Sequence, residues 1–187
     1  AVSQRRGVRV PRVRLGPARK ESINTCPPAD LCDNHEALIR DERLRVVAPM
    51  FRGYGGKAAF SGRIATLKLF EDNSFVRKAL EQPGDGRVLV IDGGGSMRRA
   101  IVGDQLAALG VKNGWQGIVA YGCIRDAAAI GAMDIGVLAL ATHPRKTDKK
   151  NIGEPDVPLT FGGVTFHPGE WLYADADGVL VSSEALT

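Results

Sequence analysis

Cysteine is scarce in this chain, whose 187 residues include only Cys26, Cys32 and Cys123. Three irregularly spaced thiols exclude a disulfide framework, and Cys26 and Cys32 lack the second Cys/His pair that a zinc site needs. Long apolar runs are missing too, since none approaches the roughly 18 residues of a membrane-spanning helix. These absences favour reduced thiols, a cytoplasmic location and no membrane partner.

Acidic residues are absent from residues 1–20, which hold seven of the 25 Lys/Arg. The rest of the chain has 18 basic and 21 acidic residues, so the high pI of 9.1 comes from the N-terminal tail. A basic footprint over the whole domain is therefore lacking, and no direct nucleic-acid contact is expected. Residues 1–24 are predicted to be a basic arm, either disordered or added upstream of the domain, although RNA, an acidic partner or an anionic surface remain open as contacts for it. Residues 25–187 form the predicted domain.

Buried strands alternate with helices in the middle of the chain, and short hairpins follow. Residues 88–91 and 117–120 are continuous apolar runs, typical of strands buried on both faces. Residues 29–40 are predicted as one helix and residues 161–166 as one strand. The pattern predicts a single α/β domain, a mixed sandwich, with the loops 92–106 and 121–126 at the carboxyl ends of neighbouring strands. Open α/β sheets bind their ligands at that edge.

A glycine-rich loop, Asp92-Gly93-Gly94-Gly95-Ser96, follows the first of these strands. It fails the dinucleotide fingerprint because Met97 and Arg98 stand where the third glycine should follow, and a phosphate-loop lysine is missing. We interpret it as a tight loop that lets the backbone approach a ligand or a neighbour.

Two further motifs carry charge at predicted loop ends. Gly103-Asp104-Gln105-Leu106 is predicted to begin a helix, where free backbone N–H groups favour a carboxylate or phosphate ligand. Asp104 at this position can capture a hydrated cation, or it can merely cap the helix. Arg125-Asp126 follows the second buried strand and offers a planar fork for a carboxylate beside a hard oxygen ligand for Mg²⁺. A surface ion pair or a helix cap is the alternative for this pair.

The other polar residues carry weaker signals. His35, His143 and His167 stand in separate contexts and do not form a metal triad, and no Ser-His-Asp arrangement is recognisable. Asp175-Ala176-Asp177-Gly178 is interpreted as a hairpin turn.

Several motifs in order resemble one known family, the regulator of ribonuclease E activity A together with the class II 4-hydroxy-4-methyl-2-oxoglutarate aldolases. The resemblance covers about residues 25–187. The motifs are Ala29-Asp30-Leu31-Cys32-Asp33, Phe70-Glu71-Asp72-Asn73, Asp92-Gly93-Gly94-Gly95-Ser96-Met97-Arg98-Arg99-Ala100, Gly103-Asp104, Asn113-Gly114-Trp115-Gln116-Gly117-Ile118-Val119, Tyr121-Gly122-Cys123-Ile124-Arg125-Asp126 and Phe161-Gly162-Gly163-Val164-Thr165-Phe166.

The resemblance implies a swivelling α/β/β sandwich that forms a trimeric or hexameric ring, with active sites between subunits. It implies that Asp126 binds a divalent cation, Mg²⁺ or Mn²⁺, and that Arg125 holds the pyruvyl part of a small 2-oxo acid and stabilises the enolate. It further implies that Asp104 steadies waters around the metal, while backbone amides at Gln105 and Leu106, next to Gly103, bind the substrate carboxylate. Longer aldolases add an acid from a neighbouring subunit, for which this chain has no assigned equivalent.

Three functions are therefore weighed. The first is a metal-dependent aldolase that releases pyruvate from 4-hydroxy-4-methyl-2-oxoglutarate and also decarboxylates oxaloacetate. It is favoured because family members that act as ribonuclease regulators can lack the metal-binding aspartate, whereas this chain keeps Arg125 and Asp126. The second is a protein that binds and inhibits ribonuclease E. The third, a menaquinone methyltransferase, is disfavoured because the glycine-rich loop offers no methyl-donor site.

Overall fold

The computed structural model describes residues 26–187, so the predicted basic arm of residues 1–24 lies outside the described residues. Its centre is a row of four parallel strands in the order β3 (Phe60–Lys68), β4 (Val88–Asp92), β6 (Gly117–Ile124) and β7 (Gly136–Thr142). The first four residues of β4 are buried on both faces, which explains its unbroken apolar run.

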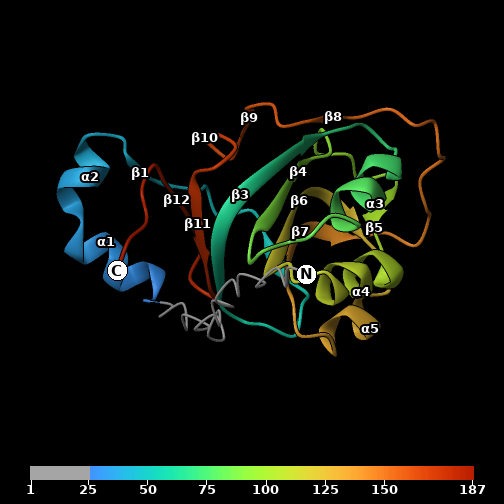
Figure 1. Ribbon diagram of the computed structural model, residues 1–187, viewed down its shortest axis with the longest axis horizontal. Coiled ribbons are helices and arrows are strands. Elements are labelled where there is room, and N and C mark those ends of the chain that lie inside the picture. Colours follow the sequence, from blue (N-terminus) through green and yellow to red (C-terminus); the bar gives the residue numbers. More distant parts are fainter. Residues whose placement is uncertain (1–25) are drawn as a thin grey trace, which may run out of the picture.

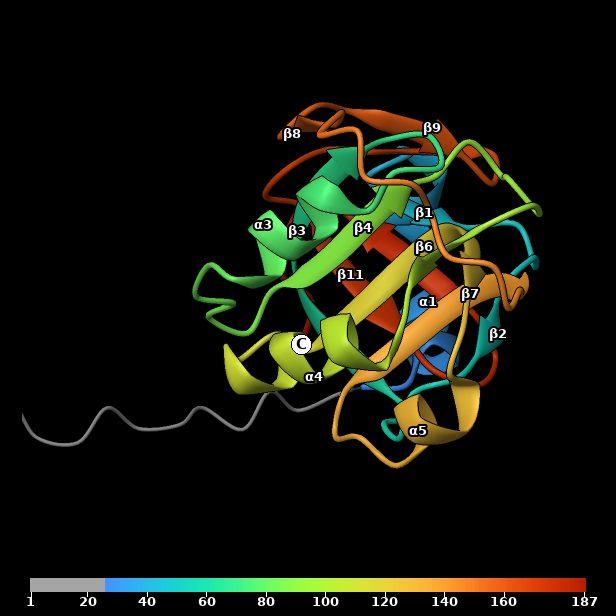
Figure 2. The same cartoon turned by 90° about the vertical axis from the view of Figure 1, so that its right-hand side faces the viewer.

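Three helices cover one face of these parallel strands (Figures 1 and 2). They are α3 (Ser74–Leu80), α4 (Asp104–Lys112) and α5 (Ala127–Gly131). Each helix buries a short apolar stripe, for example Val76 and Leu80 of α3 and Leu106 of α4. The resulting core layer lies between helices and sheet. Packing in this core layer holds α4 against the sheet, with the first residue of the helix near the carboxyl ends of the parallel strands.

The opposite face of the parallel strands is covered by β-structure. The sheet continues from β3 through β11 (Trp171–Ala174) and β12 (Val179–Ser182) to β1 (Leu44–Val46), all in antiparallel pairing. Apolar residues of β11 and β12 pack against those of β4 and β6. The two-stranded hairpin β9 (Leu159–Phe161) and β10 (Val164–Phe166) completes this second core layer.

Three short strands and two short helices complete the fold. Strand β2 (Arg52–Gly53) pairs with β7, β5 (Ala100–Val102) with β6, and β8 (Glu154–Pro155) with β3. Helices α1 (Pro28–Asn34) and α2 (Glu36–Arg40) lie at the other end of the molecule (Figure 1), where Leu31 enters a small cluster with Tyr173 and Leu186. The predicted α/β sandwich in a single domain is confirmed. Among residues 26–187, no helix is long and apolar enough to cross a membrane.

Two predicted elements are each broken in two. The helix expected at residues 29–40 is interrupted at His35, whose backbone (φ −128°, ψ 35°) leaves the helical region. The strand expected at residues 161–166 is a hairpin, because Gly162 and Gly163 both take positive φ values (62° and 75°). Adjacent glycines with positive φ are typical of a tight turn, and this signal outweighs the apolar pattern on either side.

The ring of Phe60 lies across two paired glycines at the starts of β6 and β7. Gly117 and Gly136 are partners in the sheet, and a Cβ atom on them would lie 2.4 Å and 2.0 Å from ring atoms of Phe60. Phe60 itself is buried. The ring of Phe60 therefore fits only because both positions are glycine and carry no side chain.

Replacing Gly136 with alanine is expected to lower the free energy of unfolding by about 2–3 kcal/mol, because the added methyl group overlaps a buried ring. The melting temperature should fall by roughly 5–10 °C. Gly131→Ala is the matched control, since its Cβ would meet only Tyr54 O at 3.5 Å. Thermal melts that show the two variants shifted equally would contradict the packing explanation.

Candidate functional site

The predicted loop residues meet at the carboxyl ends of β4 and β6. Strand β6 runs to Ile124, further than the predicted end at residue 120, because β5 pairs alongside its last residues. The N–H of Arg125 continues this pairing by donating to Val102 O (2.9 Å). Gly103-Asp104, which follow β5, are thereby placed beside Arg125-Asp126. The two predicted loops form one site.

The carboxylate of Asp126 is the centre of this contact. Its Oδ2 lies 3.3 Å from Arg125 Nε and accepts the N–H of Asp104 at 3.4 Å. Both side chains of the pair are a little over one third exposed. An ion pair with this much solvent contact contributes little to stability, so the alternative of a purely structural ion pair gains no weight from it.

Asp126 also has an unusual backbone. Its φ of 59° and ψ of 36° lie in the left-handed region, and although it precedes α5 its side chain makes no capping hydrogen bond. Such a conformation costs a non-glycine residue about 1 kcal/mol or more and is common at binding sites. The helix-cap alternative therefore fails on geometry, because the carboxylate is directed toward Gly103 and Asp104.

Gly103 allows the close approach of the two loops. A Cβ atom there would lie 3.0 Å from Asp126 Oδ2 and 3.3 Å from Arg125 Nε. Its backbone is extended (φ −132°), so a side chain there would be crowded by Asp126 and Arg125 without straining the backbone.

The first turn of α4 follows Gly103 directly, and its amides make local hydrogen bonds. The N–H of Gln105 donates to Asp104 Oδ1 (2.7 Å), and the N–H of Leu106 donates to Gly103 O (3.2 Å). A substrate carboxylate at this turn would therefore replace Asp104 Oδ1 on the Gln105 amide.

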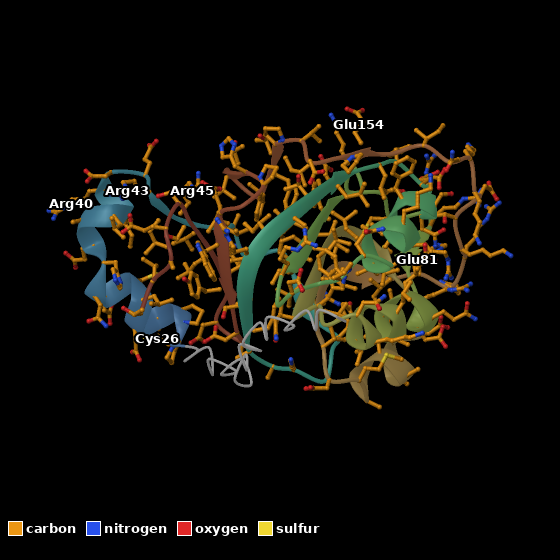
Figure 3. All side chains as sticks on the ribbon, viewed as in Figure 1. Cys26, Arg40, Arg43, Arg45, Glu81 and Glu154 are labelled. Carbon is orange, nitrogen blue, oxygen red and sulfur yellow. The ribbon has the colours of Figure 1, made fainter. Side chains whose placement is uncertain are left out.

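A cavity of about 500 Å³ opens beside these residues, within the usual size range of small-ligand sites. One wall is α3 together with Glu81, which follows its last residue and is labelled in Figure 3, and another is the loop after β7. Its basic lining residues outnumber its acids, Asp104 and Glu81; they are Arg77, Lys78, Arg125, Lys146 and Lys149. A concave surface with this excess of positive charge attracts anions.

Apart from Arg125, the basic residues of the cavity wall were not predicted as part of the site. Lys146 and Lys149 belong to a run of charged residues at 145–150, and Arg77 lies in α3, which packs on the sheet through its apolar side. Their convergence depends on the tertiary fold. The charge run was visible in the sequence, but its partner across the cavity was not.

The donors at the site fit a hard divalent cation. The carboxylate of Asp126 lies against the backbone of Asp104, whose own side chain lines the cavity, and Mg²⁺ or Mn²⁺ typically binds one or two carboxylates and keeps several waters. Within residues 26–187 no group of three or more His, Cys, Asp or Glu side chains gathers as a site of the zinc type would require. The separate positions expected for the three histidines agree with this.

The glycine-rich loop packs against its own protein. The N–H groups of Gly93 and Gly95 both donate to Tyr121 O (3.0 and 3.1 Å), and that of Gly94 donates to Asp92 Oδ1 (2.8 Å). A Cβ atom on Gly95 would lie 3.1 Å from the ring of Tyr121. The loop thus approaches a neighbouring strand, as expected, and its amides are already engaged.

The turn at residues 175–178 also behaves as predicted. The N–H of Asp175 donates to Gly178 O, and that of Asp177 to Asp175 Oδ1 (2.9 Å). These contacts close the connection between β11 and β12 and leave the pair at Arg125-Asp126 as the better candidate site.

The fold and the cavity together define an α/β sandwich with a cavity lined by basic side chains at the carboxyl edge of its parallel strands. The family model "RraA-like: Aldolase/RraA" matches residues 28–181, and the chain belongs to that family.

Among its relatives, a protein of Aromatoleum aromaticum is 63% identical over 158 residues, which are 84% of this chain and 96% of the relative; its name provisionally assigns it as a 4-hydroxy-4-methyl-2-oxoglutarate aldolase. The solved structure of the RNA-processing inhibitor RraA from Thermus thermophilus shares 42% identity and a TM-score of 0.81, over 87% of this chain and 95% of that one.

A third similar protein bears a different name. The crystal structure of a protein from Geobacillus kaustophilus, called an S-adenosylmethionine:2-dimethylmenaquinone methyltransferase, is 50% identical with a TM-score of 0.80, over 86% of this chain and 97% of that one. In the present chain the glycine-rich loop, the one segment that resembles a nucleotide-binding loop, uses its amides for Tyr121 and Asp92. Nothing in that loop favours a methyl donor.

Proposed function

We propose that this chain is a divalent-metal-dependent aldolase that cleaves 4-hydroxy-4-methyl-2-oxoglutarate to pyruvate and decarboxylates oxaloacetate as a side activity. The observation that carries the proposal is the contact of Arg125-Asp126 with Gly103-Asp104 at the edge of a cation-rich cavity. Relatives at 63% identity whose name assigns this aldolase activity support it. Both reactions break a bond to a carbon next to a 2-oxo group, so one electron sink serves both.

Asp126 is the residue proposed to hold Mg²⁺ or Mn²⁺, with Asp104 bound to its surrounding waters. When bound, the cation would polarise the 2-oxo group as a Lewis acid. Arg125 offers a fixed planar cation at the place where negative charge develops on the pyruvyl oxygen as the bond between C3 and C4 breaks. The amides of Gly103, Gln105 and Leu106 lie at the start of α4, where the substrate carboxylate is proposed to bind.

Proton movement is assigned to the other carboxylate of the site. Cleavage requires that the 4-hydroxyl group lose its proton and that C3 of the pyruvyl fragment gain one. Asp104 lies at the open edge of the cavity and is proposed to orient the water that accepts the first proton and returns the second. No lysine is needed as a covalent nucleophile.

A coupled assay of pyruvate release tests the proposal directly. With 4-hydroxy-4-methyl-2-oxoglutarate or oxaloacetate as substrate, chelator is expected to remove the activity and added Mg²⁺ or Mn²⁺ to restore it, because the carboxylates alone supply no Lewis acid. Release of pyruvate at the same rate with chelator, or no release with any metal, would contradict the assignment.

A second candidate function is inhibition of ribonuclease E. It is favoured by the 42% identity to the Thermus protein, which is named as an RNA-processing inhibitor. The two functions separate cleanly in one variant: Asp126→Asn is expected to lose pyruvate release, whereas binding of the endonuclease through a surface should survive it. Cleavage of a ribonuclease E substrate RNA, with and without the variant, is the measurement.

We further propose that the chain assembles as a trimeric or hexameric ring. The site supports this, since Arg125 and Asp126 stay more than one third exposed in a single chain and leave room for a neighbouring subunit. A cytoplasmic location is proposed from the three free cysteines. Sedimentation velocity would measure the assembly.

A further inference from the structure

Asp72 is the most deeply buried carboxylate among residues 26–187, with 1% of its surface exposed. It lies in the turn between β3 and α3. One oxygen, Oδ1, accepts the N–H of Ser74 (2.7 Å). The other, Oδ2, accepts two N–H groups from a distant loop, those of Lys150 (2.7 Å) and Ile152 (3.1 Å).

The two segments joined by Asp72 are both walls of the candidate cavity. Ser74 begins α3, which lines the cavity with Arg77 and Lys78, and the loop contributes Lys146 and Lys149. The loop has little regular structure of its own between β7 and β8. At its start it is held to β5 through Ala100 N and Arg145 O (2.8 Å), and at its end by Asp72. Lys149 lies between these two attachments.

Charge explains why a carboxylate holds the loop. Burial raises the pKa of Asp72, but the hydrogen bonds from Ser74, Ile152 and Lys150 outweigh it and keep the pKa below its usual range. The group is therefore ionised at neutral pH, and hydrogen bonds to an ionised acceptor are stronger than neutral ones. An asparagine at this position presents N–H groups on one side, so it cannot accept all three amides.

We infer that Asp72 is a positioning residue, which holds the loop carrying Lys146 and Lys149 against α3 so that these lysines meet the carboxylate of the substrate remote from Arg125. The inference rests on the proposed function, because it assigns the second end of the same substrate. Arg125 and the start of α4 bind the pyruvyl end. Among the described residues, Asp104 and Glu81 are the only acids that line the cavity, so its other basic side chains outnumber them and can bind a second carboxylate of the substrate.

Two keto acids that the enzyme cannot cleave by this route separate the two ends of the site. Pyruvate carries only the first carboxylate, whereas 2-oxoglutarate carries both and lacks the 4-hydroxyl group. Titration calorimetry with Mg²⁺ present should show that Asp72→Asn weakens 2-oxoglutarate binding about tenfold or more. Losses of this size are typical when a residue that orients a binding group, without touching the ligand itself, is replaced. Pyruvate binding should change by about twofold or less, since its contacts lie at the other end.

Asp148→Asn is the matched control for this variant. Asp148 lies in the same loop and carries the same charge, but its carboxylate pairs with Arg99 (3.1 Å) and is mostly exposed. It should leave the affinity for both keto acids within about twofold, as an exposed pair contributes little. A tenfold loss in this control as well would assign the effect to net charge and overturn the positioning role.

The wild-type protein gives a second test that does not depend on the folding of a variant. The amide protons of Lys150 and Ile152 should exchange with solvent more slowly than that of Asn151, which lies between them on the same exposed loop. Equal exchange at the three positions would overturn the attachment. Failure of both keto acids to bind the wild type would overturn the proposed function, whereas equal losses of pyruvate and 2-oxoglutarate affinity in Asp72→Asn would overturn only the positioning role.

Discussion

Replacing Asp126 with asparagine should lower metal-dependent pyruvate release by about a thousandfold or more. The loss of a charged oxygen ligand removes several kcal/mol of transition-state stabilisation, and each 1.4 kcal/mol is about a factor of ten. Asparagine tolerates the left-handed backbone that residue 126 adopts, so the fold should be retained. Steady-state kinetics over a range of Mg²⁺ and Mn²⁺ concentrations measures the effect, and part of the activity should return at high metal concentration.

Asp85→Asn is the control for this change. Asp85 shares the left-handed backbone (φ 50°) and is exposed, but it precedes β4 and so lies at the amino ends of the parallel strands. The pyruvate-release activity of the Asp85→Asn variant should equal that of the wild type. If Asp126→Asn keeps full activity that still requires a metal, the assignment of Asp126 as the metal ligand is wrong.

Replacing Arg125 with lysine should lower kcat/KM by about a hundredfold even though the charge is conserved. Loss of one preorganised donor at a developing oxyanion typically costs this much, and a lysine replaces a planar fork with a mobile point charge. Lysine also lacks the Nε group through which Arg125 faces Asp126 Oδ2 at 3.3 Å. Arg125→Ala should be worse still, because it removes the charge as well.

Arg52→Lys is the matched control, since Arg52 is exposed on the short edge strand β2. It should leave kcat and KM unchanged. An Arg125→Lys variant with at least a third of the wild-type kcat/KM would show that any cation suffices, and the proposed clamp on the pyruvyl group would then have to be abandoned.

The parts of the fold with a strong local pattern were predictable from the sequence. The continuous apolar run at residues 88–91 was predicted as a strand buried on both faces, and the first four residues of β4 are indeed buried. Parallel strands end at a common edge, so the order of elements predicted that Gly103-Asp104 and Arg125-Asp126 lie at the same edge of the sheet.

What the sequence did not predict depends on pairing between distant segments. Strand β5 has three residues, too few for a recognisable pattern, and yet its pairing extends β6 to Ile124 and sets the distance between the two loops. Lys146 and Lys149 reach the cavity through tertiary contacts of their loop, with Ala100 at its start and Asp72 at its end. His35 interrupts a helix whose apolar pattern continues through it. The candidate site residues were thus proposed from motifs and topology, whereas the other residues that line the cavity could be named only from the structure.

The overlap of Phe60 with Gly117 and Gly136 has a consequence for how this fold can vary. Three positions on three strands share one volume, so none of them can change alone without loss of stability. A smaller residue at position 60 would free space for side chains at 117 and 136, and larger residues there would force the ring out. Across the family these three positions are expected to covary as a group, and a library that randomises all three together should recover stable chains that no single substitution reaches.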